Sequence, residues 1–281
     1  MWRSLLFIPV LEDRFIAKAA ERGADAIILD LEASVADAQK AEARLKLPEV
    51  VKRLAPKTVV TVRINPLWLE AVRDLEACVI EHVRCLHLAR CEGPDEVAAI
   101  ANLVSEFEAE RGLEPGAISL IPMLESPGAV LRALAMAQAS QRVRALTIGV
   151  EDYATAMGVA ASDQLLRPAG HQVIQAARAA NIDALVVPAS IADFRNDALL
   201  REAASYARAL GATGGYAVHP KQVAVLNQVF APTQEEITWA QSVIAAHEQA
   251  PHLAVFKVNE QMIDKPLLER AQAIQRRVAS G

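Results

Sequence analysis

The stretch from Ser119 to Asp152 reads SLIPMLESPGAVLRALAMAQASQRVRALTIGVED, and it has the pattern of one complete β–α–β unit. A short apolar run opens it, an amphipathic segment follows, and a second apolar run closes it. Short runs rich in Val, Ile and Leu are typical of strands buried on both faces, as in parallel sheets covered by helices. Glu125 follows the first run and Asp152 follows the second. The stretch therefore predicts parallel strands with carboxyl groups at their ends.

The same alternation recurs on both sides of this stretch. Pro94, for example, opens a helical segment that runs toward Arg111. Eight strands alternating with helices predict an α/β fold of the (β/α)8 TIM-barrel type, closed by right-handed crossovers. A doubly wound open sheet is the alternative, but no G-x-G-x-x-G turn follows an early strand. The expected strands are Ser4–Pro9, Ala26–Leu31, Thr58–Ile64, Cys85–Arg90, Ser119–Leu124, Ala145–Val150, Asp183–Pro188 and Gly215–Pro220.

A more helical tail follows the eighth run. We expect residues 1–230 to form the barrel and residues 231–281 to form a C-terminal helical extension, with an elbow at Ala250-Pro251. Because this extension exceeds what a barrel needs, it must pack on its own barrel or on that of a neighbouring subunit. The sequence thus favours a homo-oligomer.

Composition excludes several classes of partner. The chain has 281 residues with a net charge of −5, and its basic residues are scattered, so no basic patch predicts nucleic-acid binding. No run reaches the roughly 18 uncharged apolar residues of a membrane span. The cysteines, Cys78, Cys85 and Cys91, are odd in number and follow no signal peptide. This pattern favours a reducing, cytoplasmic location.

Charged residues gather at the carboxyl ends of the expected strands, where TIM-barrel enzymes carry out their chemistry. Glu125 and Asp152 supply the hard oxygen ligands that Mg²⁺ prefers, and they leave coordination positions for water and substrate oxygens. Arg63 has the planar fork that suits a substrate carboxylate. The alternative is structural, because polar residues also terminate strands and cap helices. No cysteine and histidine spacing suits zinc, and neither a G-x-S-x-G motif nor a P-loop is present. We therefore expect His87 to be a packing residue.

Taken together, the motifs resemble those of the citrate lyase beta-subunit family, which also contains malyl-CoA, citramalyl-CoA and citryl-CoA lyases. The resemblance covers nearly the whole chain in order. The matching stretches are RSLLFIP with Arg14 after it, GADAIILDLE followed by KAEAR, VRIN, LIPMLESP, IGVEDYATAMG, YAVHPKQV with NQVFAPTQEE beyond it, and FKVNEQMIDKPLLERA.

The resemblance implies a TIM barrel that binds Mg²⁺ through Glu125 and Asp152 and the carboxylate of a 2-oxo acid through Arg63. It implies a thioester of CoA or of an acyl-carrier protein, and a homo-oligomer, with a trimer favoured. In several members the aspartate of the MID motif, here Asp264, reaches a neighbouring subunit's site as the acid/base. Its alternative role is a helix N-cap. The implied reaction is a retro-Claisen cleavage, with Glu32 as a further catalytic residue.

Two further enzymatic or binding functions compete with this one. A CoA-independent oxo-acid aldolase would keep the fold and the metal, whereas a basic groove near Arg14, Arg44 and His219 would favour CoA. A non-catalytic lyase-like binding subunit is the third hypothesis, because Ala33 and Ala156 replace acids that are usual in the family. The remaining departures from the family pattern are Val10-Leu11, Ala89-Arg90, Gly214-Gly215 and Glu260.

Overall fold

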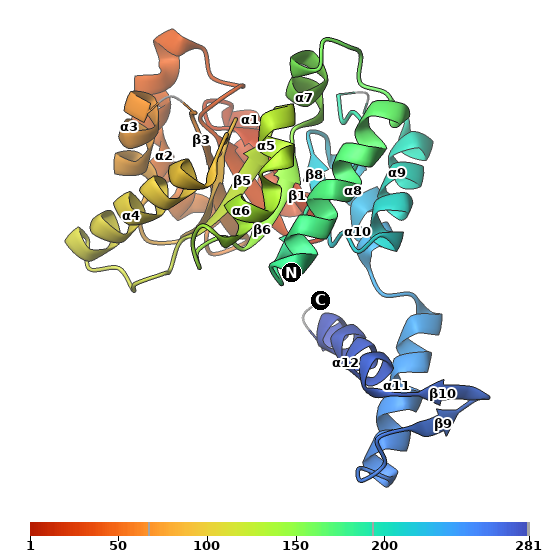
Figure 1. Cartoon of the computed structure of the whole chain (residues 1–281). Coiled ribbons are helices and arrows are strands. Elements are labelled where there is room, and N and C mark those ends of the chain that lie inside the picture. Colours follow the sequence, from red (N-terminus) through yellow and green to blue (C-terminus); the bar gives the residue numbers. More distant parts are fainter. Residues whose placement is uncertain (67, 193, 280–281) are drawn as a thin grey trace. The chain divides into compact units, whose positions relative to one another are not determined.

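The apolar runs form the strands of one parallel sheet, surrounded by helices (Figure 1). The computed structural model describes residues 1–66, 68–192 and 194–279, and within them eight strands belong to this sheet. The strands are β1 (Ser4–Pro9), β2 (Ala26–Asp30), β3 (Val59–Ile64), β4 (Val83–Leu88), β5 (Ser119–Leu124), β6 (Ala145–Ile148), β7 (Asp183–Ala184) and β8 (Gly215–Ala217).

The sheet curls until its ends meet. Its order is β7-β6-β5-β4-β3-β2-β1-β8, so β1 pairs with both β2 and β8. A parallel bridge between Leu185 and Gly214 joins the β7 end to the β8 end. The predicted TIM-barrel fold is confirmed, and the open-sheet alternative is wrong because the strands follow one another in sequence order around the sheet and its two ends are joined.

Helices follow most strands. Two of the strands are shorter than the sequence predicts. The predicted strand over 183–188 ends early, at Ala184, and the predicted strand over 215–220 ends at Ala217, because Pro220 already begins a helix. The helices and 3₁₀ turns of this unit are α1 (Asp13–Ile16), η1 (Ala19–Arg22), η2 (Asp37–Gln39), α2 (Lys40–Leu54), α3 (Trp68–Cys78), α4 (Pro94–Glu110), α5 (Pro127–Leu131), α6 (Ala133–Gln138), α7 (Val150–Ala156), α8 (Asp163–Ala179), α9 (Asp197–Ala209) and α10 (Pro220–Phe230).

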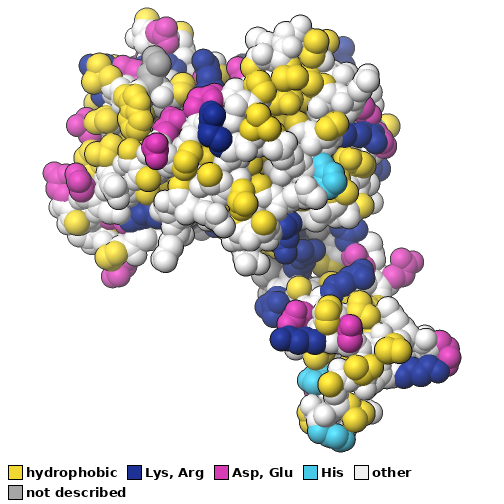
Figure 2. All heavy atoms as spheres, in the orientation of Figure 1, with side chains coloured by type: hydrophobic (Ala, Val, Ile, Leu, Met, Phe, Trp, Pro, Cys, Tyr) yellow, Lys and Arg dark blue, Asp and Glu magenta, His cyan; other side chains and the backbone are white. Residues whose placement is uncertain are grey.

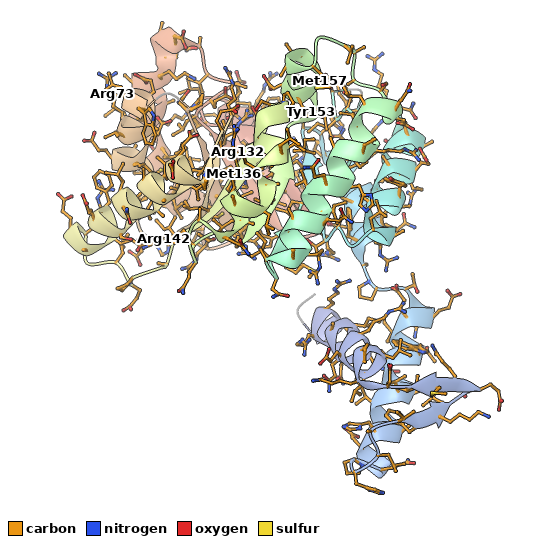
Figure 3. The ribbon with its side chains drawn as sticks, viewed as in Figure 1. Arg73, Arg132, Met136, Arg142, Tyr153 and Met157 are labelled. Carbon is orange, nitrogen blue, oxygen red and sulfur yellow. The ribbon has the colours of Figure 1, made fainter. Side chains whose placement is uncertain are left out.

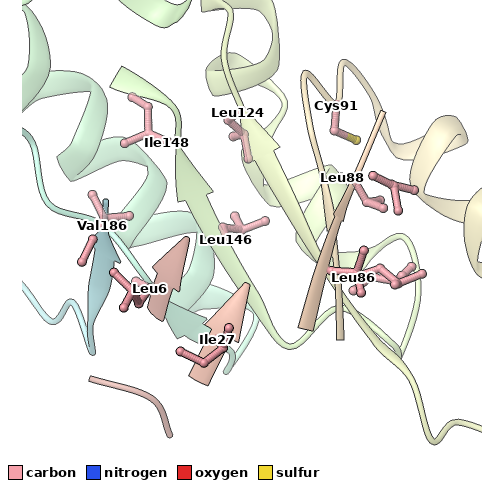
Figure 4. Packing of buried hydrophobic residues seen from close by; sticks show 14 of the residues in the cluster. Leu6, Ile27, Leu86, Leu88, Cys91, Leu124, Leu146, Ile148 and Val186 are labelled. Atoms are coloured by element: carbon pink, nitrogen blue, oxygen red, sulfur yellow. The ribbon is translucent and has the colours of Figure 1, made fainter. Parts of the chain in front are cut away.

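Alternate residues of each strand face opposite sides of the sheet, as the period of two requires. Leu6 and Ile27 belong to the large core between strands and helices, together with Leu86, Leu124 and Leu146 on later strands (Figure 4). The intervening residues face the barrel interior, where Leu5, Ile28, Cys85, Ile121 and Met123 form part of a second cluster. The strands are therefore buried on both faces, which explains their continuous apolar runs.

Residues 231–281 form a separate compact unit, grouped with Met1. This unit contains α11 (Gln234–Gln249), β9 (Phe256–Val258), β10 (Gln261–Ile263) and α12 (Lys265–Ala279). The extension is mainly helical, as expected, and it also contains an antiparallel hairpin formed by β9 and β10. The two turn residues, Asn259 and Glu260, both have positive φ, as a type I′ turn requires. The sequence did not predict this hairpin, because glutamate is an unusual residue in a type I′ turn.

Other sequence expectations concern surfaces and cysteines. No helix within the described ranges is long and apolar enough to cross a bilayer. On the face shown in Figure 2, acidic and basic side chains are interspersed. Cys78, Cys85 and Cys91 are buried and free.

Glu108 ties α4 to the loop before β5, and its loss should destabilise the barrel. Its buried carboxylate accepts hydrogen bonds from the backbone N–H groups of Gly116 and Ile118 and from Arg142, which Figure 3 labels. Glu108→Ala should cost about 3 kcal/mol, because it leaves the Arg142 guanidinium without its buried partner. Urea unfolding measures the loss. Glu106→Ala, an exposed position of the same helix, is the control.

The same ion pair should make stability depend on pH. Burial acts to raise the pKa of Glu108, but the hydrogen bonds from Arg142 and the two amides outweigh it and lower the pKa below its usual 4.5. A lowered folded-state pKa stabilises the protein above the unfolded value, and this contribution is lost as pH falls through the folded-state pKa. The stability difference between the wild type and Glu108→Ala should therefore shrink in acid. An unchanged difference would contradict this role.

Candidate active site

The two-residue period of the strands brings three charged side chains to one end of the barrel. Ile28 and Met123 face the interior, so Asp30 and Glu125, two residues further along, face the same way at the carboxyl ends of β2 and β5. Arg63 projects from β3 in the same manner. All three line a cavity of about 460 Å³ at this end of the barrel. Its position is that of the active site in TIM-barrel enzymes.

Asp30 holds Arg63 in place. Arg63 donates from Nε and Nη2 to the two carboxylate oxygens of Asp30, each at 2.7 Å. Burial acts to raise the pKa of Asp30, but the hydrogen bonds and charge of Arg63 outweigh it and lower the pKa. The guanidinium also lies 4.6 Å from the centre of the Phe7 ring. Asp30 thus uses one edge of Arg63, while Nη1 and Nη2 each carry a second N–H, so this end of the guanidinium can still donate to an anion beside Glu32. Asp30 was not among the site residues predicted from the sequence.

Glu32, the predicted catalytic residue after β2, lies between two guanidinium groups. One oxygen is 3.2 Å from Nη1 of Arg63, and the other accepts a 2.8 Å hydrogen bond from Nη2 of Arg90. Its side chain is buried. The structure therefore brings Glu32 and Arg63 together, as expected from their places after neighbouring strands.

Glu125 is buried in an acidic setting. Burial, followed by the charges of Asp152 and Glu32, raises the pKa of Glu125 to about 8. Gly149 makes room for this side chain, because a Cβ at Gly149 would lie 2.5 Å from Cγ of Glu125. This close approach explains the glycine directly after β6.

Asp152 reaches the same cavity from the first turn of α7, next to Glu151. The described residues contain no cluster of three or more His, Cys, Asp or Glu side chains arranged around a metal position. Two carboxylates are nevertheless a fitting donor set for Mg²⁺, which usually keeps waters and takes further oxygens from its substrate. A divalent cation between Glu125 and Asp152 would also relieve the repulsion that raises the pKa of Glu125.

Gly149→Ala should displace the Glu125 carboxylate and weaken Mg²⁺ binding by at least about tenfold, because a Cβ that overlaps a ligand forces that ligand to move. Isothermal titration with Mg²⁺ measures the change. Gly93→Ala is the matched control, since the nearest side-chain atom to a Cβ there lies 4.0 Å away. Equal Mg²⁺ affinity in the two variants would contradict the assignment of Glu125 as a ligand.

A buried hydrogen-bonded chain lies beneath the cavity. His87 Nδ1 is 2.7 Å from the Tyr216 hydroxyl, and His87 Nε2 is 2.9 Å from the Thr61 hydroxyl. Thr61 donates its proton to Ile27, so Nε2 of His87 is the donor and Tyr216 donates to Nδ1. Burial and the charges of Arg63 and Arg144 lower the pKa of His87 to about 3, which keeps it neutral. His87 is thus a packing residue with both nitrogens satisfied, and Tyr216, missed from the sequence, carries this chain to the cavity wall.

Like Glu32, the other predicted site residues lie outside this cavity lining. Arg14 is exposed in α1 and pairs with Glu12. Arg44 is held on α2 by Glu70 and Asp74. His219 follows β8, where its ring stacks on Phe194 with centres 4.7 Å apart. Asp264 belongs to the C-terminal unit, where its carboxylate caps α12 by accepting a 3.3 Å hydrogen bond from the N–H of Leu267.

The sequence is also similar to those of known proteins. Residues 3–220 match the family model for HpcH/HpaI aldolase/citrate lyase. This chain belongs to the HpcH/HpaI aldolase/citrate lyase family. Among its relatives in this family, citrate lyase subunit beta of Escherichia coli K12 is 32% identical over 278 residues, covering 97% of this chain and 91% of that protein. Citramalyl-CoA lyase of Rattus norvegicus mitochondria is 31% identical over 289 residues, covering 97% and 84%.

A solved structure of a family relative shares the architecture of the whole chain. Protein CitE of Mycobacterium tuberculosis, in complex with magnesium, acetoacetate and coenzyme A, superimposes with a TM-score of 0.75 at 28% identity, covering 98% of this chain and 97% of that one. The predicted resemblance to the citrate lyase beta-subunit family is confirmed. In this HpcH/HpaI family member, Ala33 lines the cavity and adds no charge to its wall.

Proposed function

We propose that this chain is a Mg²⁺-dependent carbon–carbon lyase that cleaves a 3-hydroxyacyl-CoA of the citryl, malyl or citramalyl type into an acyl-CoA and a 2-oxo acid. The observation that carries the proposal is the meeting of Glu125, Asp152 and Arg63 around one cavity. Family membership supports it, as does the presence of magnesium and coenzyme A in the CitE complex.

In this proposal, the acidic residues of the cavity bind the metal and the basic residue binds the substrate. Glu125 and Asp152 would hold Mg²⁺, which when bound supplies Lewis-acid stabilisation to the oxygen that becomes the carbonyl. The outer end of Arg63 binds the carboxylate adjacent to that oxygen. The guanidinium of Arg63 is held in one orientation, because Asp30 accepts two hydrogen bonds from its other edge.

The proton transfers need two further groups. Glu32, beside Arg63, takes the hydroxyl proton of the substrate as the C–O bond becomes C=O. The C–C bond breaks in the same step in which that C=O forms, and its electron pair stays on the α-carbon of the thioester. Asp264 of a neighbouring subunit returns a proton to that carbon. This last role requires a homo-oligomer, for which we favour the trimer, and it is compatible with the exposure of Asp264.

One observation favours the CoA-independent aldolase as a second candidate. The guanidinium of Arg44 is already bound to Glu70 and Asp74, which removes one of the three expected CoA contacts and leaves Arg14 and His219. Thermal stabilisation by CoA separates the two candidates. CoA at about 100 times its dissociation constant should stabilise the lyase by ~2.7 kcal/mol, and no shift would favour the aldolase.

A coupled assay tests the proposed reaction. Purified protein with Mg²⁺ is offered citryl-CoA, malyl-CoA and citramalyl-CoA, with EDTA in a parallel series. We expect cleavage of at least one thioester, lost in EDTA. Binding of Mg²⁺ and a 2-oxo acid without cleavage of any thioester would contradict the lyase and favour the non-catalytic subunit. In that case, Ala33→Asp restores the family's usual acid and is the first variant to assay. A cytoplasmic location is part of the proposal, supported by the three free cysteines.

A further inference from the structure

The KAEAR motif, residues 40–44, lies at the start of α2, and neither of its basic side chains lines the cavity. The ammonium group of Lys40 instead donates hydrogen bonds to two successive backbone carbonyls. It lies 3.0 Å from the oxygen of Leu31 and 2.7 Å from that of Glu32. An ammonium group has three donors and no acceptor, so it suits a pair of carbonyl oxygens. Lys40 thus anchors the backbone of the segment that carries Glu32.

The VRIN motif holds the carbonyl of Leu31 from a second direction. Nδ2 of Asn65 donates to this carbonyl at 3.0 Å and to the Asp74 carboxylate at 2.7 Å. Asp74 is buried, and it also accepts hydrogen bonds from the backbone N–H of Asn65 and from Nε of Arg44. Through this pair, Arg44 supports the same carbonyl that Lys40 binds. The second basic residue of the KAEAR motif therefore has a structural partner in the same network.

The backbone of Glu32 is fixed on both sides. Its N–H donates to the Asp30 carboxylate at 3.0 Å, and its C=O accepts from Lys40. The direction of the backbone determines where the side chain points, and the side chain of Glu32 is buried beside the guanidinium groups of Arg63 and Arg90. The two backbone contacts thus direct the Glu32 carboxylate toward Arg63, which lines the cavity.

Arg63 and Glu32 depend on this network to different degrees. Asp30 holds Arg63 directly, with two hydrogen bonds from its side chain. The Glu32 carboxylate contacts two guanidinium groups, and one of them belongs to the 56% exposed side chain of Arg90. Glu32 therefore relies more than Arg63 does on the anchoring of its backbone.

We propose that Lys40 is a positioning residue for the proton transfer at Glu32, and that Asn65 and Arg44 support it. Lys40 keeps the Glu32 carboxylate within reach of the substrate hydroxyl, and a displacement of about 1 Å at a reacting group can cost about 100-fold in rate. The inference rests on the proposed function, because Glu32 is the base proposed there.

Removal and restoration of the ammonium group test this role. Lys40→Cys removes the group. Alkylation of the new thiolate by 2-bromoethylamine, with loss of bromide, then gives a side chain of nearly the same length that again ends in an ammonium group. Position 40 is partly exposed, whereas Cys78, Cys85 and Cys91 are buried, so the reagent reacts with the new thiol in the folded protein.

We expect kcat for thioester cleavage to fall at least about tenfold in Lys40→Cys with KM within about twofold, and alkylation to return kcat to within about threefold of the wild type. The affinity for pyruvate in the presence of Mg²⁺ should stay unchanged, because Arg63 keeps its hydrogen bonds to Asp30. Lys52→Cys, at an exposed position of α2, is the matched control. Alkylated in the same way, it should keep the wild-type kcat throughout.

The outcomes separate this inference from the proposed function. Unchanged kcat in Lys40→Cys, no recovery after alkylation, or an equal loss of kcat and of pyruvate affinity would overturn the inference while leaving the lyase intact. A wild-type protein that binds Mg²⁺ and pyruvate but cleaves no thioester would overturn the proposed function, and this inference with it.

Discussion

Replacing Glu125 by Gln should abolish the stabilisation of the protein by Mg²⁺ and pyruvate. In the wild type, ligand at about 100 times its dissociation constant adds ~2.7 kcal/mol to the free energy of unfolding. Gln keeps the shape of the side chain but removes one of the two cavity carboxylates proposed to hold Mg²⁺. Thermal unfolding with and without Mg²⁺ and pyruvate measures the effect, and cleavage of the thioester substrate should be lost with it.

The variant should fold normally. Burial and the charges of Asp152 and Glu32 oppose ionisation of Glu125, so the neutral amide should leave the EDTA-treated protein at least as stable as the wild type. Glu106→Gln, at an exposed position of α4, controls for a general change of charge. If Glu125→Gln responds to Mg²⁺ as this control does, Glu125 is not a metal ligand.

Two inactive variants should restore activity when their subunits are mixed. Asp264→Asn lacks the proposed proton donor, and Glu125→Gln lacks a metal ligand. If Asp264 acts in a neighbouring subunit's site, co-expression of the two with different affinity tags creates sites that combine an intact barrel with an intact tail. About a quarter of the sites in randomly mixed oligomers should be of this kind. Activity of doubly tagged oligomers measures the fraction, which rises to about a third in doubly tagged trimers because the inactive homo-oligomers are removed.

Each alternative predicts a different result in this experiment. If Asp264 acts within its own subunit, every mixed site carries one defect and the oligomers stay inactive. If Asp264→Asn alone keeps full cleavage, Asp264 is simply the cap of α12. Either result would also remove the main reason to expect an active site shared between two subunits.

Local pattern predicted most of the barrel. Runs such as Ala26–Asp30 are short, apolar and followed by polar residues, and the period of two sends Asp30 and Glu125 to the same end. The run over 183–188 misled the prediction, because its apolar residues pack into the cavity wall and the core without continuing the strand pairing. Hydrophobicity alone does not distinguish a residue buried in a paired strand from a residue buried in a segment that packs on the core without pairing.

Long-range pairings were beyond the reach of sequence reasoning. Arg44 follows a motif of the family, yet its partners Glu70 and Asp74 lie on the next helix, α3. The chain from Thr61 through His87 to Tyr216 joins three strands far apart in sequence. Such contacts depend on which side chains share the barrel interior, and single strands do not reveal this. The hairpin at Asn259-Glu260 was missed for a local reason, since Glu replaces the glycine that would have indicated it.

The seam where the barrel closes has a kinetic consequence. β7 and β8 are the shortest strands of the sheet, and they meet through the Leu185–Gly214 bridge and a 2.8 Å hydrogen bond from the Thr213 N–H to Ala184. Local opening concentrates where few backbone hydrogen bonds hold. Amide protons at this seam should exchange with solvent sooner than those between β2 and β3, as hydrogen-exchange mass spectrometry can measure. Because Leu185 also lines the cavity, this stretch of the cavity wall would be the part of the barrel best able to adjust to the shape of a ligand.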